Sequence, residues 1–250
     1  MKHVMKAIIL SAGKGERLLP LTKDRPKICV ELGDGTTLLS RQAGTLFRHK
    51  EIDEIIIGAG HCVERVEEFA SMTVDQGNMT IIYNPFYAVS GPLVTLWVVL
   101  NRLRSSDFIF MNGDTFYSDA VYDSIVSYFS NGKEGIYLLC SRTGKVDPDD
   151  VKVRLNQNSE VLEATKSATG LDIISAGLMM VIGEKSSTVF REILDRVSRR
   201  DDFLSHKKTW HSFIKDLAGE GVGVHPLLVE KSEWAEVDIH NDLENLQRLL

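Results

Sequence analysis

Short apolar runs alternate with segments in which apolar residues recur every three or four positions, and this pattern fills the first 140 residues. The short runs predict strands over residues 7–10, 28–32, 53–60, 79–83, 108–111 and 135–140. The helical spacing predicts helices over residues 37–49, 63–70, 94–103 and 119–130, the last with Asp119 as its N-cap. Strands and helices that alternate in this way form a mixed, mostly parallel sheet with helices on both faces. The sequence therefore predicts a Rossmann-like α/β fold, in which ligands bind beyond the carboxyl ends of the strands.

The pattern changes after residue 142. An acidic loop over residues 143–150 precedes two alternating runs, 151–155 and 161–165, and the turn between these runs predicts a β-hairpin. Further strands are expected over residues 172–182 and 222–229, and helices over 186–199, 209–218 and 241–250. We expect a single domain over residues 1–250, with one half at about 1–140 and a small β-rich half at about 141–250. The acidic residues of the loop, Asp147, Asp149 and Asp150, are expected to be solvated rather than to bind a metal ion.

The composition favours a small-molecule ligand. The chain of 250 residues is 43% apolar and has a net charge of −6, without a run of lysine and arginine. Nucleic acids and anionic membranes bind basic surfaces, so neither is an expected partner. The chain shows no signal-peptide pattern and no apolar run of the ~18 residues that a spanning helix needs, so we expect a cytoplasmic protein. Cys29, Cys62 and Cys140 have no metal-binding spacing and are expected to be reduced.

The most informative segment is residues 7–27, AIILSAGKGERLLPLTKDRPK. A buried strand enters a loop that contains Gly13 and Gly15, together with the basic residues Lys14, Arg17 and Lys27. Glycine lets backbone N–H groups approach phosphate oxygens, and basic side chains supply the opposite charge. The segment matches neither the dinucleotide fingerprint nor the Walker phosphate loop, so an ordinary solvated turn is the alternative.

Two later segments have similar chemistry. Ser90-Gly91-Pro92 indicates a loop. Gly91 would allow the backbone to approach a flat nucleobase, although a plain turn is equally consistent. The apolar run 108–111 ends in Asn112-Gly113-Asp114. Aspartate is rarely buried without a partner, so Asp114 at the end of a buried strand predicts a bound divalent cation. The alternative is that Asp114 is an N-cap or Asx-turn residue.

Three motifs resemble the signature of the nucleotidyltransferase family that makes NDP-sugars and CDP-alcohols. Residues 10–27 match L-[AS]-[AG]-G-x-G-x-R-[LM]-x-P-x-T-x-x-x-P-K, residues 113–114 match the Gly-Asp pair, and residues 234–243 match W-x-[ED]-[VI]-D-x-x-x-D-[LY]. The motifs occur in the family's order and cover essentially the whole chain. The resemblance implies transfer of a nucleotidyl group from a nucleoside triphosphate to a phosphorylated acceptor, with release of pyrophosphate.

The resemblance also implies roles for individual residues. The first half would bind the nucleotide through Leu10, Ala12, Gly13, Lys14, Gly15, Arg17, Asn84, Ser90, Gly91 and Thr95. The second half would bind the acceptor, through Lys166, Gly177 and Trp210 together with Lys27. Asp114 and Asp238 would bind Mg²⁺, and the catalytic residues would be Arg17, Lys27, Asp114 and Asp238.

Two features suggest the branch of the family. Residues 84–97, NPFYAVSGPLVTLW, resemble the phosphocholine cytidylyltransferases, and Lys166 lacks the preceding glutamate that is typical of the sugar branch. We therefore expect CTP as the donor and a small phosphorylated alcohol or phosphonate as the acceptor. The alternatives are a sugar-1-phosphate uridylyl-, thymidylyl- or guanylyltransferase, a metal-dependent glycosyltransferase and a non-catalytic nucleotide sensor. Tyr117, Trp210 and Trp234 are candidates for a cage around a quaternary ammonium group.

Overall fold

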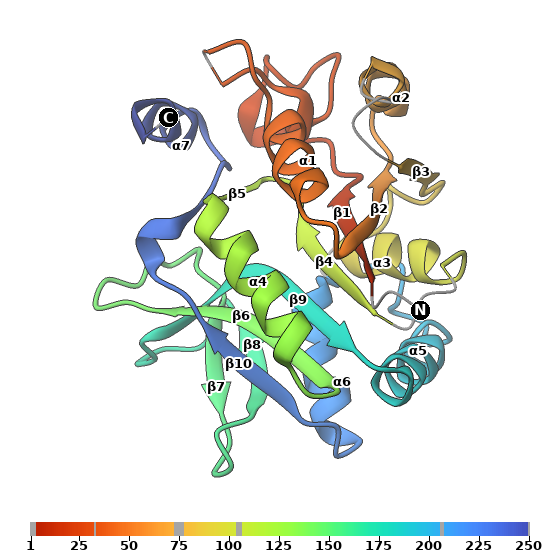
Figure 1. Ribbon diagram of the computed structural model, residues 1–250, viewed down its shortest axis with the longest axis vertical. Coiled ribbons are helices and arrows are strands. Elements are labelled where there is room, and N and C mark those ends of the chain that lie inside the picture. Colours follow the sequence, from red (N-terminus) through yellow and green to blue (C-terminus); the bar gives the residue numbers. More distant parts are fainter. Residues whose placement is uncertain (1–3, 33, 73–77, 104–106, 206–207, 250) are drawn as a thin grey trace.

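The computed structural model describes residues 4–249, except for 33, 73–77, 104–106 and 206–207. Its central sheet has the strand order β10-β6-β9-β4-β1-β2-β3 (Figure 1). These strands are β1 (Met5–Ser11), β2 (Ile52–Ala59), β3 (Met79–Tyr83), β4 (Phe108–Asn112), β6 (Gly135–Arg142), β9 (Ile173–Ile182) and β10 (Val224–Leu228). Strand β9 runs antiparallel to both of its neighbours, and the other pairs along this order are parallel. The predicted mixed, mostly parallel sheet is confirmed.

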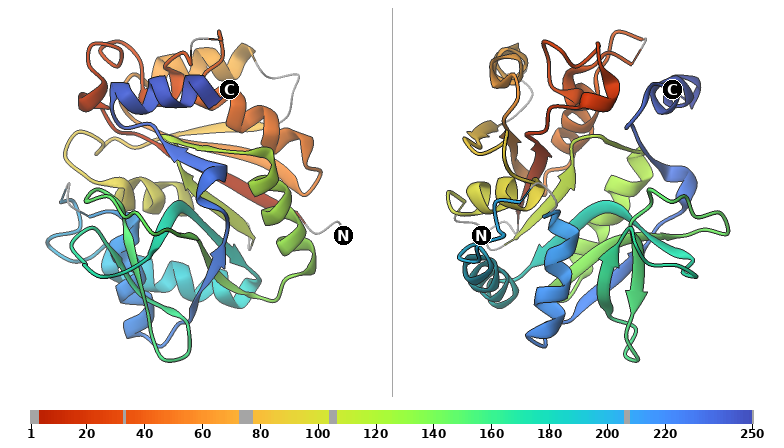
Figure 2. Two further views of the ribbon diagram at one scale, coloured as in Figure 1. Left: turned by 90° about the vertical axis from the view of Figure 1, so that its left-hand side faces the viewer. Right: turned by 180° about the vertical axis from the view of Figure 1, so that it is seen from behind.

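Helices cover both faces of the sheet. One face packs against α1 (Leu38–Arg48), α2 (Val63–Met72), α4 (Asp119–Asn131) and α7 (His240–Leu249). The other face packs against α3 (Pro92–Leu100), α5 (Glu184–Val197) and α6 (Ile214–Gly219). Because successive side chains of a strand point to opposite faces, Ile9 packs on the first face and Ile8 on the second. The left view of Figure 2 shows the two layers, with yellow α3 and cyan α5 below the sheet.

Two small β structures accompany the central order of strands. Strands β7 (Lys152–Leu155) and β8 (Val161–Thr165) form the expected hairpin. Strands β5 (Thr115–Tyr117) and β11 (Trp234–Glu236), which the hydrophobic pattern did not predict, form a separate antiparallel sheet. This pairing matters for the site, because it brings the end of the chain to the carboxyl end of β4.

Three local predictions are wrong. Residues 28–32 do not form a strand, because a turn of 3-10 helix over Lys27–Cys29 begins directly after Pro26. Asp119 is not the N-cap of α4; Ser118 has that position, and Asp119 accepts a hydrogen bond from Thr45 instead. The helix predicted over residues 209–218 begins as a separate 3-10 turn, Trp210–Phe213. The other helices and strands lie within three residues of their predicted ends, close to the usual uncertainty of such boundaries.

Two further findings concern helices and thiols. Among the described residues, no helix combines the length and the apolar character that crossing a membrane requires. Cys29, Cys62 and Cys140 are free thiols, and Cys140 is buried.

Candidate active site

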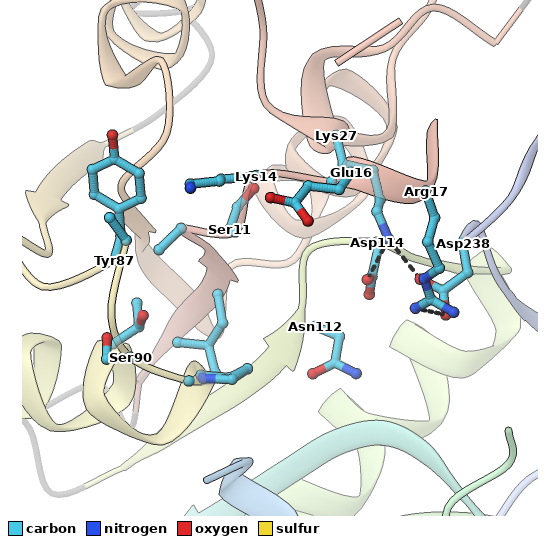
Figure 3. Close-up of a pocket in the computed structure, with 18 residues that line it drawn as sticks. Ser11, Lys14, Glu16, Arg17, Lys27, Tyr87, Ser90, Asn112, Asp114 and Asp238 are labelled. Atoms are coloured by element: carbon cyan, nitrogen blue, oxygen red, sulfur yellow. Dashed lines mark hydrogen bonds and ion pairs between the residues drawn. The ribbon is translucent and has the colours of Figure 1, made fainter. Parts of the chain in front are cut away.

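A cavity of about 760 Å³ lies at the carboxyl ends of β1 and β4 (Figure 3). Its wall includes residues 10–17 at the end of β1, Lys27, residues of the loop before α3, and Asn112 and Asp114 at the end of β4. Asp238, from the end of the chain, completes it. Of the predicted nucleotide-binding residues, all but Asn84 line this cavity. Its volume suits a ligand of nucleotide size.

The glycine loop has a defined backbone shape. Gly15 has a φ of +64°, and the Thr22 hydroxyl donates a hydrogen bond of 2.8 Å to the Gly15 carbonyl. A Cβ atom at Gly15 would lie 3.0 Å from Cγ2 of Thr22, whereas a Cβ at Gly13 would meet nothing within 4 Å. Gly15 and Thr22 therefore shape the loop, and Gly13 leaves space open in the cavity.

We expect Gly15→Ala to destabilise the fold and Gly13→Ala to leave its stability unchanged. Alanine in the left-handed conformation of Gly15 should lower the free energy of unfolding by about 1–2 kcal/mol, which corresponds to roughly 2–8 °C in Tm for a chain of this size. Gly13→Ala should leave Tm unchanged but weaken triphosphate binding, because its methyl group enters the space that phosphates would occupy. Thermal melts and calorimetric titrations measure both effects. Unchanged triphosphate affinity in folded Gly13→Ala would remove this loop from phosphate binding.

Lys27 lies between two carboxylates that are remote in the sequence. Its Nζ is 2.9 Å from Oδ2 of Asp114 and 2.6 Å from Oδ1 of Asp238, and Arg17 Nη2 is 2.8 Å from Oδ2 of Asp238 (Figure 3). Burial opposes the charge of Lys27, but Asp114 and Asp238 together raise its pKa above the ordinary value. Burial would raise the pKa of Asp238, yet Lys27 and Arg17 lower it. We call Lys27, Asp114 and Asp238 the ion-pair triangle.

The small β5–β11 sheet positions the triangle. Asp114 directly precedes β5, and its carbonyl oxygen accepts a 2.8 Å hydrogen bond from the N–H of Val237, the residue after β11. At the next residue, the N–H of Asp238 donates to Oδ2 of Asp242 in the first turn of α7. The two aspartates are thereby attached to neighbouring backbone segments.

A third carboxyl group, Glu236, lies beside the triangle. Its pKa is raised to about 8, first by burial and then by repulsion from Asp114 and Asp238. Lys166 and Lys27 act in the opposite direction but do not cancel these two effects.

The donor set fits Mg²⁺. The described residues contain no group of three or more His, Cys, Asp or Glu side chains arranged to hold a metal ion. Mg²⁺ typically binds through one or two carboxylates, substrate phosphates and water, so two carboxylates are sufficient. Asp114 and Asp238 both lie within 3 Å of one point, the Nζ of Lys27, which places them suitably for a shared cation.

Glu236→Gln should change how stability depends on pH in the metal-free protein. The pKa of Glu236 is about 8 when folded and 4.5 when exposed, so the folded state binds more protons between these values and the free energy of unfolding falls as pH rises through this window. At pH 8 the variant should unfold at least about 2–4 °C above the unaltered protein, and the difference should disappear near pH 4. Melts across this range measure it, and parallel curves would contradict the assignment.

The loop before α3 contains residues that line the cavity and residues that support them. Tyr87, Ser90 and Gly91 of the loop line the cavity, as does Thr95 of α3. Asn84 is fully buried, donates from Nδ2 to Oγ1 of Thr95 at 3.0 Å and accepts from the backbone of Phe86 at 2.9 Å. This corrects the expectation that the Asn84 side chain contacts the nucleotide, because both of its polar atoms are already paired.

The predicted acceptor residues are more scattered. Lys166 is half exposed, and its Nζ lies 3.6 Å from Oδ1 of Asp149. Asp149 is exposed, as expected, but it also lies 3.3 Å from Arg17, so it links the two predicted halves. Gly177 and Trp210 do not line the cavity, and Trp210 is 1% exposed. The expectation that these two residues contact the acceptor directly is therefore corrected, because both lie behind the cavity wall.

The aromatic cage does not form. Tyr117 and Trp234 belong to the core on one face of the sheet, whereas Trp210 belongs to the core on the other face. All three are buried, and the polar atoms of Tyr117 and Trp234 are hydrogen-bonded to the Ala176 carbonyl and the Ser141 hydroxyl. They are core residues, as large aromatic residues usually are.

Comparison with known proteins identifies the family. Residues 6–150 match the model of the family described as nucleotidyl transferase. The chain belongs to this family. It is 26% identical to the CTP:phosphoglutamine cytidylyltransferase of Campylobacter jejuni, over 96% of this chain and 98% of that protein. It is also 32% identical to the choline-phosphate cytidylyltransferase of Streptococcus pneumoniae, over 41% of this chain and 42% of that protein.

Solved structures agree on the fold. The structure of the inositol-1-phosphate CTP transferase from T. maritima superposes with a TM-score of 0.80 at 17% identity, covering 99% of this chain and 95% of that one. The CTP:phosphocholine cytidylyltransferase of Streptococcus pneumoniae superposes with a TM-score of 0.75 at 19% identity, covering 98% and 99%. The predicted family and fold class are confirmed, and the protein is a nucleotidyltransferase.

The sequence did not single out every residue that lines the cavity, and Tyr87 and Asn112 are two that it missed. Both belong to segments that the motifs cover, but nothing in the sequence distinguished them from their neighbours. Glu236, beside the ion-pair triangle, was also missed; it is the last residue of β11, a strand that the hydrophobic pattern did not reveal. Recognition of β11 would have supplied the signal.

Proposed function

We propose that the protein is a Mg²⁺-dependent cytidylyltransferase that transfers CMP from CTP to a small phosphorylated alcohol or phosphonate. The observation that carries the proposal is the ion-pair triangle, which places a cation and two carboxylates at one end of a cavity whose other wall is a glycine loop. The choice of CTP is supported by relatives named as CTP:phosphoglutamine and choline-phosphate cytidylyltransferases.

In the proposed reaction, an oxygen of the acceptor phosphate or phosphonate attacks the α-phosphorus of CTP. A new P–O bond forms, the bond between the α-phosphorus and its bridging oxygen breaks, and pyrophosphate leaves with the bonding electrons. A phosphate group has a second pKa near ~6 and is largely ionised at neutral pH, so no general base is needed. Accordingly, no histidine is among the described residues that line the cavity.

The remaining task is to bring two anions together, and positioned charge achieves this. The N–H groups of residues 13–15 and the guanidinium of Arg17 would hold the β- and γ-phosphates. Lys27, which its carboxylate neighbours keep protonated, would attract the acceptor. Bound to Asp114 and Asp238, Mg²⁺ would supply further charge stabilisation at the α-phosphate. Residues 1–140 would thus bind the nucleotide and residues 141–250 the acceptor, in a single domain that shares one sheet.

The test is a screen for pyrophosphate release. CTP, UTP, GTP and dTTP are each incubated with phosphocholine, 2-aminoethylphosphonate, inositol and glycerol phosphates, and hexose 1-phosphates, with Mg²⁺ or with EDTA. Release with CTP and a non-sugar acceptor, lost in EDTA, is expected. Release only with a hexose 1-phosphate would favour the sugar branch, and no release from any pair would contradict the proposal.

Lys166→Ala should raise the KM of the acceptor more than the KM of CTP. Lys166 lies on the acceptor half, just past β8, and does not line the cavity where the glycine loop lies. Its loss should therefore weaken attraction of the second anion and leave the first one bound. Lys145→Ala, a substitution in the same exposed region, is a matched control. A larger increase in the KM of CTP would remove Lys166 from the acceptor side.

A further inference from the structure

Asn112, the last residue of β4, lines the cavity and carries a side-chain amide (Figure 3). Its Oδ1 accepts a 2.8 Å hydrogen bond from Nε1 of Trp210. An indole N–H can only donate, so the oxygen of Asn112 must face Trp210 and the amino group must face away from it. The orientation of this amide therefore follows from the chemistry of its partner.

The partner is held rigidly. Trp210 is buried, packs edge-on against Phe110 with ring centroids 5.0 Å apart, and stacks on His211 at 3.6 Å. The Nε2 of His211 lies 2.9 Å from Oγ of Ser175, which accepts a 3.1 Å hydrogen bond from the N–H of Gly177. Burial lowers the pKa of His211 to about 3, so this support stays uncharged at neutral pH.

Gly177 leaves room for the amino group. Its φ is +74°, and a Cβ atom there would lie 2.9 Å from Nδ2 of Asn112. Any larger residue would press on the amide that Trp210 orients. Trp210 and Gly177 thus act on Asn112 from behind the cavity wall, which explains why neither reaches the cavity itself.

The amino group of Asn112 has no acceptor among the described residues, although its residue lines the cavity. Its place along the cavity indicates what it meets. Asn112 pairs with Leu10 of β1. A Cβ at Gly58 of β2 would touch both Leu10 and Thr95 of α3, so β1 lies between Asn112 and the part of the cavity wall that Thr95 forms next to the loop before α3. Two residues further, Asp114 belongs to the ion-pair triangle. In a nucleotide, the ribose is what joins the base to the α-phosphate.

We propose that the side-chain amide of Asn112 donates a hydrogen bond to a ribose hydroxyl of the bound nucleotide, and that Trp210 is the positioning residue that sets its direction. This inference rests on the proposed function, because it assumes that the base lies by the loop before α3 and the α-phosphate by Asp114. It makes Asn112 a determinant of binding for nucleotides that carry ribose hydroxyls over those that lack them. A ligand without the matching oxygen loses the hydrogen bond from this donor.

The test compares the binding of CTP and 2′,3′-dideoxy-CTP by calorimetry, without acceptor. The unaltered protein should bind CTP about three- to tenfold more tightly, the value of one hydrogen bond. Asn112→Leu, close in size but without a donor, should bind both nucleotides equally. Trp210→Phe keeps an aromatic ring but removes the N–H, so it should reduce the same preference. Matched controls are Asn131→Leu and Trp97→Phe, whose side chains pair outside the cavity with Ser127 and Asp195.

A double variant separates positioning from general support. In the Asn112→Leu background, Trp210→Phe should not reduce the preference for CTP over 2′,3′-dideoxy-CTP any further. If Trp210 had only a structural role, Trp210→Phe would instead weaken the binding of both nucleotides equally, with or without Asn112→Leu. The inference is overturned if the unaltered protein binds CTP and its dideoxy form equally, a result that needs no variant, or if folded Asn112→Leu keeps the full preference.

Failure of the proposed function gives a different result. If the screen selects another triphosphate, the choice of CTP is wrong. The inference about Asn112 is then tested in the same way, by comparing the binding of the ribo- and dideoxy forms of that triphosphate. If the protein binds no triphosphate, both the proposed function and this inference are overturned.

Discussion

Asp114→Ala and Asp238→Ala should each lower kcat by at least about 10²–10³, the usual loss when one preorganised charge-stabilising group is removed. Each substitution removes half of the carboxylate pair that lies within 3 Å of Lys27. The fold should survive, since both side chains lie at the cavity surface rather than in the apolar core. Initial rates of pyrophosphate release with saturating substrates measure the effect, and circular dichroism checks the fold.

The control for these variants is Asp123→Ala, an exposed aspartate on α4 whose loss should leave the rate unchanged. If Asp114 and Asp238 bind Mg²⁺, the residual activity of both active-site variants should also no longer respond to Mg²⁺. Turnover at the unaltered rate in either variant would refute the assignment of that residue.

Lys27→Met should reduce both turnover and stability. The Lys27 side chain is 14% exposed and its ammonium pairs with two carboxylates. Its removal leaves Asp114 and Asp238 close together beside Glu236, with Arg17 as the remaining cation paired to Asp238. We expect a rate loss of about 10²–10³ and a loss of roughly 1–3 kcal/mol at neutral pH, as for other broken pairs that are partly buried.

The pH dependence of this loss follows from the two pKa shifts. The pKa of Asp238 is lowered from 3.8 in the fold, so its contribution is present above that value and is lost as pH falls through the folded pKa. The pKa of Lys27 is raised from 10.5, so its contribution is present below that value and is lost only in strong alkali. The difference between Lys27→Met and the unaltered protein should therefore be largest between about pH 5 and pH 9 and shrink towards pH 3. Denaturant unfolding at several pH values measures it; a difference independent of pH would contradict the triangle.

The site was predicted best where local sequence determines local chemistry. Gly15 and Thr22 are seven residues apart and interact directly, so the loop's shape is encoded within the motif that was recognised. The same is true of Asp114, which lies two residues after the end of an apolar strand, at the edge of the sheet where ligands bind.

The site was predicted least well where burial decides whether a side chain faces the cavity. Asn84 and Trp210 are polar or amphipathic residues in segments of the site, and a sequence does not show on which side of the cavity wall such side chains lie. The structure places both behind it, with their polar atoms already paired to Thr95, Phe86 and Asn112.

The sequence alone determined the α/β architecture, because strands and helices bury apolar residues with different periods that can be read position by position. It also determined the glycine loop and the kinds of charged group available for phosphate chemistry. Only the tertiary structure decided how those groups meet. Lys27 and Asp238 are 211 positions apart, and they come together through the pairing of β5 with β11, strands of three residues each. Such short strands carry too few side chains for an alternating pattern to specify a partner, so their pairing is set by the packing of the whole chain around them.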